Sequence, residues 1–138
     1  MWRRAAAVLV LVVTLVALAG CGQSTEDAIR AKVQELAQAV GQRDYATICQ
    51  QILAPSLVAH LTRNGIPCQD ALRVALGNTK QPVVSVGKVV LRGGRAWAIT
   101  LTSARGERAT LTAIALRRTS NGWRITSLDS PLSAAEGK

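Results

Sequence analysis

The residue pattern of the chain changes at "NTKQP", residues 78–82. Before this stretch, apolar side chains recur three and four positions apart, which is the spacing of an amphipathic helix. After it, Val, Thr, Ile and Trp predominate and small turns interrupt the chain about every ten residues, as in an antiparallel sheet. This order predicts an α+β fold in which N-terminal helices pack on a curved four-stranded antiparallel meander.

The part of the chain before the change contains four predicted helices. The first begins at Ser24 or Thr25, residue types that cap helix N-termini, and stops at Gly41. The second begins at Asp44 and ends at Pro55, because proline lacks the N–H group that a helix interior needs. The two shorter predicted helices span residues 56–65 and 68–77.

Four strands joined by three hairpins are predicted after the change. They span residues 82–92, 95–104, 108–118 and 122–128. In the second strand, alternation puts Trp97, Ile99 and Leu101 on one face, which we expect the helices to cover, and Ala98 and Thr100 on the wetter face. The side chains expected to line the core or a pocket are Tyr45, Trp97, Ile99, Leu101 and Trp123.

Residues 1–20 have the features of a signal peptide. Arg3 and Arg4 precede an apolar run from Ala5 to Ala17, and its 13 residues are fewer than the about 20 that span a bilayer. Small residues follow this run. The pattern therefore favours a cleaved secretory signal, with a helical apolar segment, over a transmembrane helix.

The signal ends in "LAGC", residues 18–21, which is an aliphatic residue, two small residues and a cysteine. This motif resembles the lipobox of bacterial lipoproteins. The resemblance implies that Cys21 carries a diacylglycerol, with acyl chains such as palmitate, and becomes the mature N-terminus on the extracytoplasmic side of the cell membrane. An ordinary signal peptide with an incidental cysteine is the alternative. The mature chain would then consist of a tether over 21–24, a domain over 25–130 and a flexible C-terminal tail over 131–138.

Two other cysteines, Cys49 and Cys68, remain once Cys21 is lipidated. An even number of thiols in an oxidising compartment indicates one disulfide. A structural zinc site is the less favoured interpretation. It needs four ligands, and besides these two thiols the chain offers only one histidine, His60. We therefore expect a Cys49–Cys68 disulfide and no metal.

Helices followed by a meander that ends in "NGWRI" resemble the nuclear transport factor 2-like superfamily. The resemblance covers about residues 25–128 and implies a cone whose curved sheet wraps the helices and can leave a pocket between them. A cystatin-like arrangement, with one helix on a meander, is the alternative. The matching residues are Gly41, Asp44, Tyr45, Cys49, Cys68, Gly122, Trp123 and Ile125.

The same cone hosts isomerases, hydratases and members without a reaction, so the fold does not decide the function. Isomerases of this kind use an aspartate base and acidic or phenolic donors in an apolar pocket, and the predicted strands are poor in carboxylates. His60 is a base by chemical type, but a lone histidine near a loop is more often a surface residue. No phosphate-binding motif or metal-ligand spacing appears, so no catalytic residue and no cofactor are expected.

Basic residues are concentrated in the second half of the chain. Without the signal, 15 basic and 8 acidic side chains remain, and 11 of the basic ones follow Asp70. Such a surface attracts anionic lipid, wall polymer or an acidic envelope protein, whereas a solvated strand edge is the simpler explanation. The absence of an exposed aromatic platform disfavours nucleic acid. The contacts expected for an anionic surface are Arg92, Arg95, Arg105, Arg108, Arg117 and Arg118, among strand-borne cations that also include Lys88 and Arg124.

Three functions follow from these observations. The first is a membrane-anchored, non-catalytic module that binds a ligand or partner in the cell envelope. The second is a small enzyme of the isomerase or hydratase type, which would need a solvent-reached cavity with His60 or a carboxylate pointing into it. The third is a structural envelope protein, which would have neither a pocket nor a contiguous basic patch.

Overall fold

The computed structural model describes residues 24–137. The predicted signal peptide over residues 1–20 and the lipidation site Cys21 lie outside this range. Among the described residues, no helix combines the length and the apolar character that crossing a membrane requires.

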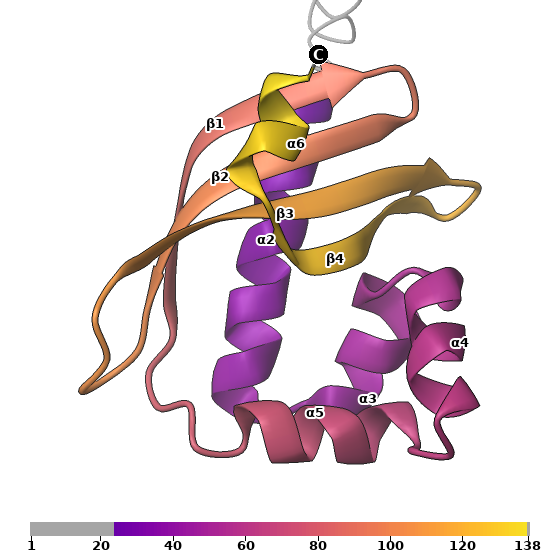
Figure 1. The fold of residues 1–138 in the computed structure, drawn as a ribbon, viewed down its shortest axis with the longest axis vertical. Helices are drawn as coiled ribbons and strands as arrows, with labels where there is room; N and C mark the ends of the chain where they lie inside the picture. Colours follow the sequence, from indigo (N-terminus) through magenta and orange to yellow (C-terminus); the bar gives the residue numbers. More distant parts are fainter. Residues whose placement is uncertain (1–23, 138) are drawn as a thin grey trace, which may run out of the picture.

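Helices occupy the first half of the described chain and strands the second, so the predicted α+β class is confirmed (Figure 1). The sheet is antiparallel with strand order β1-β2-β3-β4, which also confirms the three hairpins. The helical elements are α2 (Thr25–Gln42), α3 (Tyr45–Thr47), the π-helix η2 (Ile48–Ile52), α4 (Pro55–Arg63) and α5 (Cys68–Leu76). The remaining elements are β1 (Val83–Arg92), β2 (Arg95–Ser103), β3 (Thr110–Thr119), β4 (Gly122–Ser130) and α6 (Leu132–Glu136).

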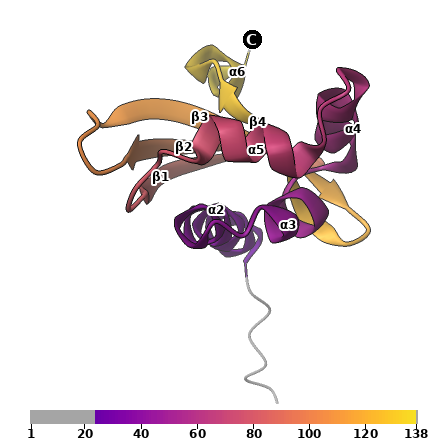
Figure 2. The same ribbon diagram turned by 90° about the horizontal axis from the view of Figure 1, so that it is seen from below.

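Helix α2 lies along one face of the sheet and runs antiparallel to β1. Arg30 donates from Nη1 to the Val86 carbonyl (2.6 Å) and from Nη2 to the Gly87 carbonyl (2.9 Å). One turn further on, Gln34 donates to the Val84 carbonyl (2.9 Å). The start of α2 therefore lies beside the end of β1. Figure 2 shows α2 on one side of the sheet and α6 on the other.

Capping determines where α2 begins and ends. The Ser24 hydroxyl accepts a hydrogen bond from the Asp27 N–H (3.1 Å), so Ser24 is the N-cap. The predicted stop at Gly41 is wrong, because the helix continues to Gln42 and ends where Arg43 adopts a left-handed backbone (φ 57°). This left-handed turn lets the Arg43 N–H donate to the Val40 carbonyl (3.1 Å) and the Asp44 N–H donate to the Ala39 carbonyl (2.9 Å), so the last carbonyls of α2 are satisfied.

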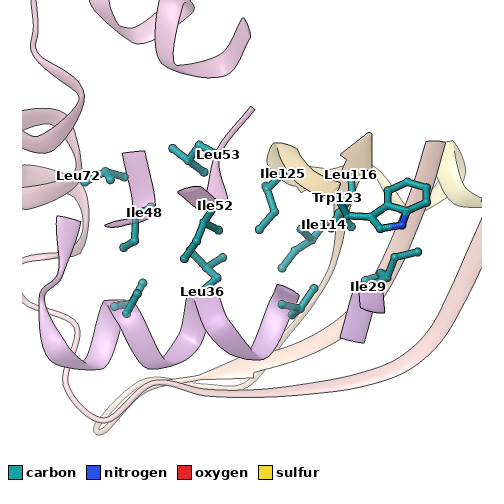
Figure 3. Close-up of a cluster of buried hydrophobic side chains, with 14 of the residues drawn as sticks. Ile29, Leu36, Ile48, Ile52, Leu53, Leu72, Ile114, Leu116, Trp123 and Ile125 are labelled. Atoms are coloured by element: carbon teal, nitrogen blue, oxygen red, sulfur yellow. The ribbon is translucent and has the colours of Figure 1, made fainter. Parts of the chain in front are cut away.

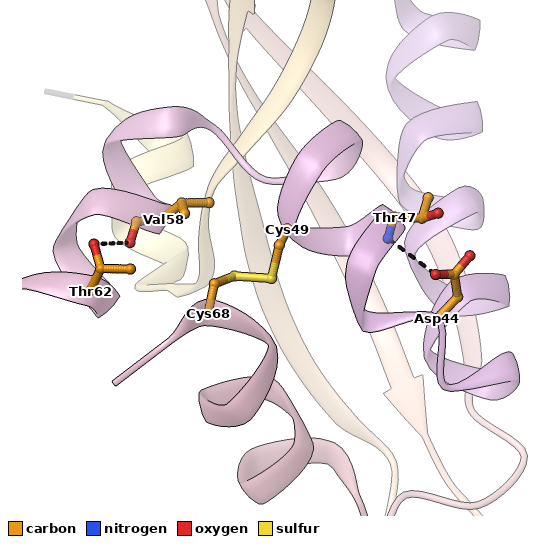
Figure 4. Close-up of a disulfide and its surroundings, with 6 residues drawn as sticks. All are labelled: Asp44, Thr47, Cys49, Val58, Thr62 and Cys68. Atoms are coloured by element: carbon orange, nitrogen blue, oxygen red, sulfur yellow. Dashed lines mark hydrogen bonds between the residues drawn. A yellow bond between two sulfur atoms is a disulfide. The ribbon is translucent and has the colours of Figure 1, made fainter. Parts of the chain in front are cut away.

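The second predicted helix is two short pieces, α3 and η2, and it ends before Pro55. Leu53 is extended and pairs with Ile125 of β4, while the Ala54 N–H donates to the Ile125 carbonyl (2.7 Å). Pro55 is instead the first residue of α4, where its missing N–H costs nothing. The predicted Cys49–Cys68 disulfide joins η2 to the first residue of α5 (Figure 4).

The core fills the space between the helices and the inner face of the sheet (Figure 3). Tyr45 and Trp123 belong to it, as expected, with 7% and 8% of their surface exposed. The fully buried large apolar side chains are Ile29, Val33, Ile48, Ile52, Leu53, Leu116 and Ile125.

The predicted orientation of β2 is wrong. Ala96, Ala98 and Thr100 are completely buried on the face toward α2, whereas Leu101 is 48% exposed on the opposite, outer face. Trp97 and Ile99 are half-buried on that outer face. The physical reason is that small side chains let α2 pack close to the middle of the sheet. The sequence shows the alternation of side chains along β2. It does not show that α2 packs so close to the strand that only small side chains fit on that face.

Part of the predicted flexible tail over 131–138 is helical among the described residues, which end at residue 137. Residues Leu132–Glu136 form α6, which packs on the outer face of β2 and β3. Ala135 is only 3% exposed, and its carbonyl accepts a hydrogen bond from Arg92 Nη2 (2.8 Å). This helix accounts for the partial burial of Ile99, which lines a space together with Leu132 and Ala135.

Asp44 gives stability a dependence on pH. Hydrogen bonds from Thr47 hold the pKa of the Asp44 carboxyl below its usual range, and the Thr47 N–H lies 3.1 Å from Oδ1. A lowered pKa means that this stabilisation is present above the pKa of the unfolded chain and is lost as the pH falls through the folded pKa. We therefore expect Asp44→Asn to melt below the parent at pH 7 and the two melting temperatures to converge as the pH falls from 7 through the pKa of the folded Asp44 carboxyl. Thermal unfolding by circular dichroism measures this, and a constant difference across that range would contradict it.

Candidate functional site

A pocket opens between the C-terminal half of α2 and the β2–β3 hairpin, and we call it the mouth pocket. Its volume is about 240 Å³. Leu36 and Val40 of α2 and Ile114 of β3 line its interior, while Glu107 and Arg108 of the hairpin belong to its rim. The mouth pocket therefore suits an apolar group with a polar end.

The residues that could act as acids or bases do not converge in the mouth pocket. His60 is exposed on α4 and does not line this pocket; its Nδ1 lies 2.8 Å from Arg63 Nη2. Tyr45 is in the core. Glu107 is the carboxylate of the pocket lining, and it is an exposed turn residue. A general base with an orienting partner is therefore not assembled among the lining residues.

Four arginines form one row across the outer face of the sheet, and we call them the arginine row. Arg92 pairs with Arg95, Arg95 with Arg117, and Arg117 with Arg124, each directly opposite the other in the strand register. Directly opposed residues point to the same face. The row therefore crosses all four strands at the end of the sheet where the β1–β2 and β3–β4 hairpins lie.

The two ends of the arginine row are held by the protein itself. Arg92 donates to the Ala135 carbonyl of α6 (2.8 Å), and its guanidinium carbon lies 5.4 Å from the centre of the Trp97 ring. Arg124 donates from Nη1 to the Gln50 carbonyl of η2 (2.8 Å). These contacts give both outer arginines a structural role.

The two central arginines line an open cavity. Arg95 and Arg117 border a space of about 300 Å³, which we call the arginine cavity. Trp97, Ser56 of α4 and Thr126 of β4 contribute to the same lining. Over residues 24–137, no side-chain hydrogen bond involves Arg95 or Arg117, and the three ion pairs use Arg30, Lys32 and Arg73 instead.

The other predicted arginine contacts lie elsewhere. Arg105 and Arg108 belong to the β2–β3 hairpin, at the opposite end of the sheet from the arginine row. Arg118 pairs with the buried Trp123, so it points to the other face than Arg117 does. Arg124 was not among the six arginines expected to contact an anionic surface. Only the pairing of β3 with β4 places it beside Arg117.

No metal site is present among the described residues, since no group of three or more His, Cys, Asp or Glu side chains converges there. The two thiols that could have bound zinc form the disulfide.

Comparison of the whole chain with protein-family models, with curated proteins and with solved structures finds no match. The function therefore has to be argued from the site itself.

Proposed function

We propose that this protein is a lipid-anchored, extracytoplasmic binding module of the bacterial cell envelope, with a domain of the nuclear transport factor 2-like kind. The arginine cavity carries this proposal, because two cations without acidic partners among the described residues border an open space. Since unpaired like charges on neighbouring strands destabilise a sheet, their presence favours a role in binding an anion.

An enzyme of the isomerase or hydratase type is the second candidate, supported by the mouth pocket. Such an enzyme needs a base directed into the cavity. The exposed position of His60 on α4 and of Glu107 on a hairpin favours binding over proton transfer. A purely structural envelope protein is disfavoured by the contiguous arginine row.

Anchoring is tested by replacing Cys21 with alanine in the full chain. We expect the parent to incorporate labelled palmitate and to sediment with membranes, because a diacylglycerol supplies the two chains that stable anchoring requires. Cys21→Ala should incorporate no label. Equal labelling of both proteins, or a parent protein that is found only in the soluble fraction, would contradict the proposed anchor.

A pull-down from envelope extracts then separates anchoring from binding. The parent and the Cys21→Ala variant should retain the same partners if the folded domain carries the binding surface. Loss of all partners in Cys21→Ala would show that membrane attachment, and not the domain alone, creates the binding site.

A further inference from the structure

We propose that Arg95 and Arg117 bind the phosphate group of an anionic phospholipid headgroup, so that the domain meets the bilayer with the end of the sheet that carries the arginine row. The inference rests on the proposed function in one respect, the attachment of the chain through Cys21. It adds the chemical class of the ligand, the residues that bind it and the orientation of the domain.

The charge arrangement of the row points to an oxyanion. Arg95 and Arg117 are directly opposed across β2 and β3, and both lack an acidic partner among the described side chains. Guanidinium groups match phosphate oxygens through paired N–H donors. An anion between the two arginines would offset their mutual repulsion, which the protein itself leaves uncompensated.

The shape of the arginine cavity agrees with this ligand. Its volume of about 300 Å³ equals that of about ten water molecules in the liquid, enough for a phosphate with part of its glycerol group. Ser56 adds a hydroxyl group to the lining and Trp97 adds an aromatic surface, while the Thr126 hydroxyl donates to the Ala115 carbonyl (3.2 Å). The two outer arginines are held by Trp97 and by the Gln50 carbonyl. The two central arginines therefore remain free to bind an anion.

The position of the arginine row relative to the N-terminus identifies a lipid as the source of the phosphate. Because α2 is antiparallel to β1, its N-cap Ser24 lies at the same end of the molecule as the β1–β2 hairpin and the arginine row. The three residues from Cys21 to Ser24 span at most about 10 Å, which is comparable with the Debye length at physiological salt. An anchored Cys21 would therefore hold the row close to the headgroups.

The opposite end of the sheet provides a matched control. Helix α2 has 18 residues and is therefore about 27 Å long, so the β2–β3 hairpin with Arg105 and Arg108 lies well beyond the Debye length from the anchored end. Removing two arginines there changes the net charge by the same amount as removing Arg95 and Arg117. A difference in vesicle binding between the two double variants therefore reflects the position and geometry of the arginines, and not the total charge of the protein.

The test uses a chain that starts at Gly22 and therefore lacks the anchor. This chain keeps every core side chain, because all of them lie between Ile29 and Ala135. Binding is measured by cosedimentation with vesicles of pure phosphatidylcholine and with vesicles that contain phosphatidylglycerol. We expect binding to the phosphatidylglycerol vesicles only, unchanged within twofold in Arg105→Gln/Arg108→Gln and weakened at least tenfold in Arg95→Gln/Arg117→Gln.

Equal weakening by the two double variants, or binding of the parent to vesicles of pure phosphatidylcholine, would overturn the proposal. So would saturation by glycerol 3-phosphate without any vesicle binding. The last result would assign the site to a soluble phosphate ester.

The melting temperature of Arg95→Gln/Arg117→Gln should equal or exceed that of the parent, since the substitution relieves repulsion. Arg95→Lys/Arg117→Lys, which keeps the charge but loses the paired donors, should bind less than the parent, and parent-like binding would refute the phosphate clamp.

The outcome does not depend on the lipid anchor, because the tested chain has no Cys21. If palmitate labelling fails while the vesicle test succeeds, the arginine site stands and the anchor is wrong. If labelling succeeds while the two double variants behave alike, the anchor stands and the arginine site is wrong.

Discussion

Replacing Cys49 and Cys68 together by alanine should lower the free energy of unfolding by about 3 kcal/mol. The disulfide spans 19 positions and joins η2 to α5, with α4 inside the closed loop. Without it, the unfolded chain gains the freedom that the cross-link removes. Urea unfolding of the chain that starts at Gly22 measures the change, with both cysteines replaced so that no free thiol remains.

Reduction of the parent protein by dithiothreitol is the matched experiment for the disulfide. It should produce a loss similar to that of the double alanine variant, because both remove the same cross-link. A loss below about 1 kcal/mol in both cases would contradict the role given to the bridge. Helices α4 and α5 would then be held mainly by their apolar contacts.

Ile52→Ala should cost about 2–5 kcal/mol of unfolding free energy. Ile52 is fully buried at the end of η2, in the cluster that connects α2 to the sheet (Figure 3). Truncation removes its apolar contacts and leaves a cavity that the short π-helix cannot readily close. Urea unfolding again provides the measurement.

The control for Ile52→Ala is Val74→Ala, on the exposed side of α5. Val74 is 87% exposed, so its truncation should change the unfolding free energy by less than about 0.5 kcal/mol. Similar losses in the two variants would mean that the cluster around Ile52 is not the core of the domain.

The strands and hairpins were predictable because their signals are local. Turn residues and β-branched runs place the four strands within two residues of their observed ends. The disulfide was predictable from an even count of thiols. The bounds of α2 and the separate start of α4 at Pro55 were not, because they depend on the left-handed backbone of Arg43 and on the pairing of Leu53 with Ile125.

The orientation of β2 shows where alternation alone misleads. Trp97, Ile99 and Leu101 form the more apolar face in sequence, but α2 packs against Ala96, Ala98 and Thr100. Which face is covered depends on how closely the helix approaches, and that is a tertiary property. The sequence likewise contained no signal strong enough to place α6 on the outer face.

The candidate site was predictable as a set of cations but not as a geometry. Arg92, Arg95 and Arg117 were recognisable as strand-borne arginines, whereas their alignment into one row depends on the register of three strand pairs, with bulges in β1–β2 and β3–β4. The row lies between the hairpin turns and these bulges, so the turns set Arg92 opposite Arg95 and Arg117 opposite Arg124. The pairing of Arg95 with Arg117 depends on the register of β2 with β3, which are joined by a longer loop, and it emerges only in the folded sheet.

The proposed lipid anchor is tested by the mass of the protein extracted from membranes of a bacterium that expresses the full chain. We expect a chain of residues 21–138 that carries a diacylglycerol on the Cys21 sulfur. An uncleaved chain beginning at Met1, or a cleaved chain with an unmodified Cys21 thiol, would contradict it.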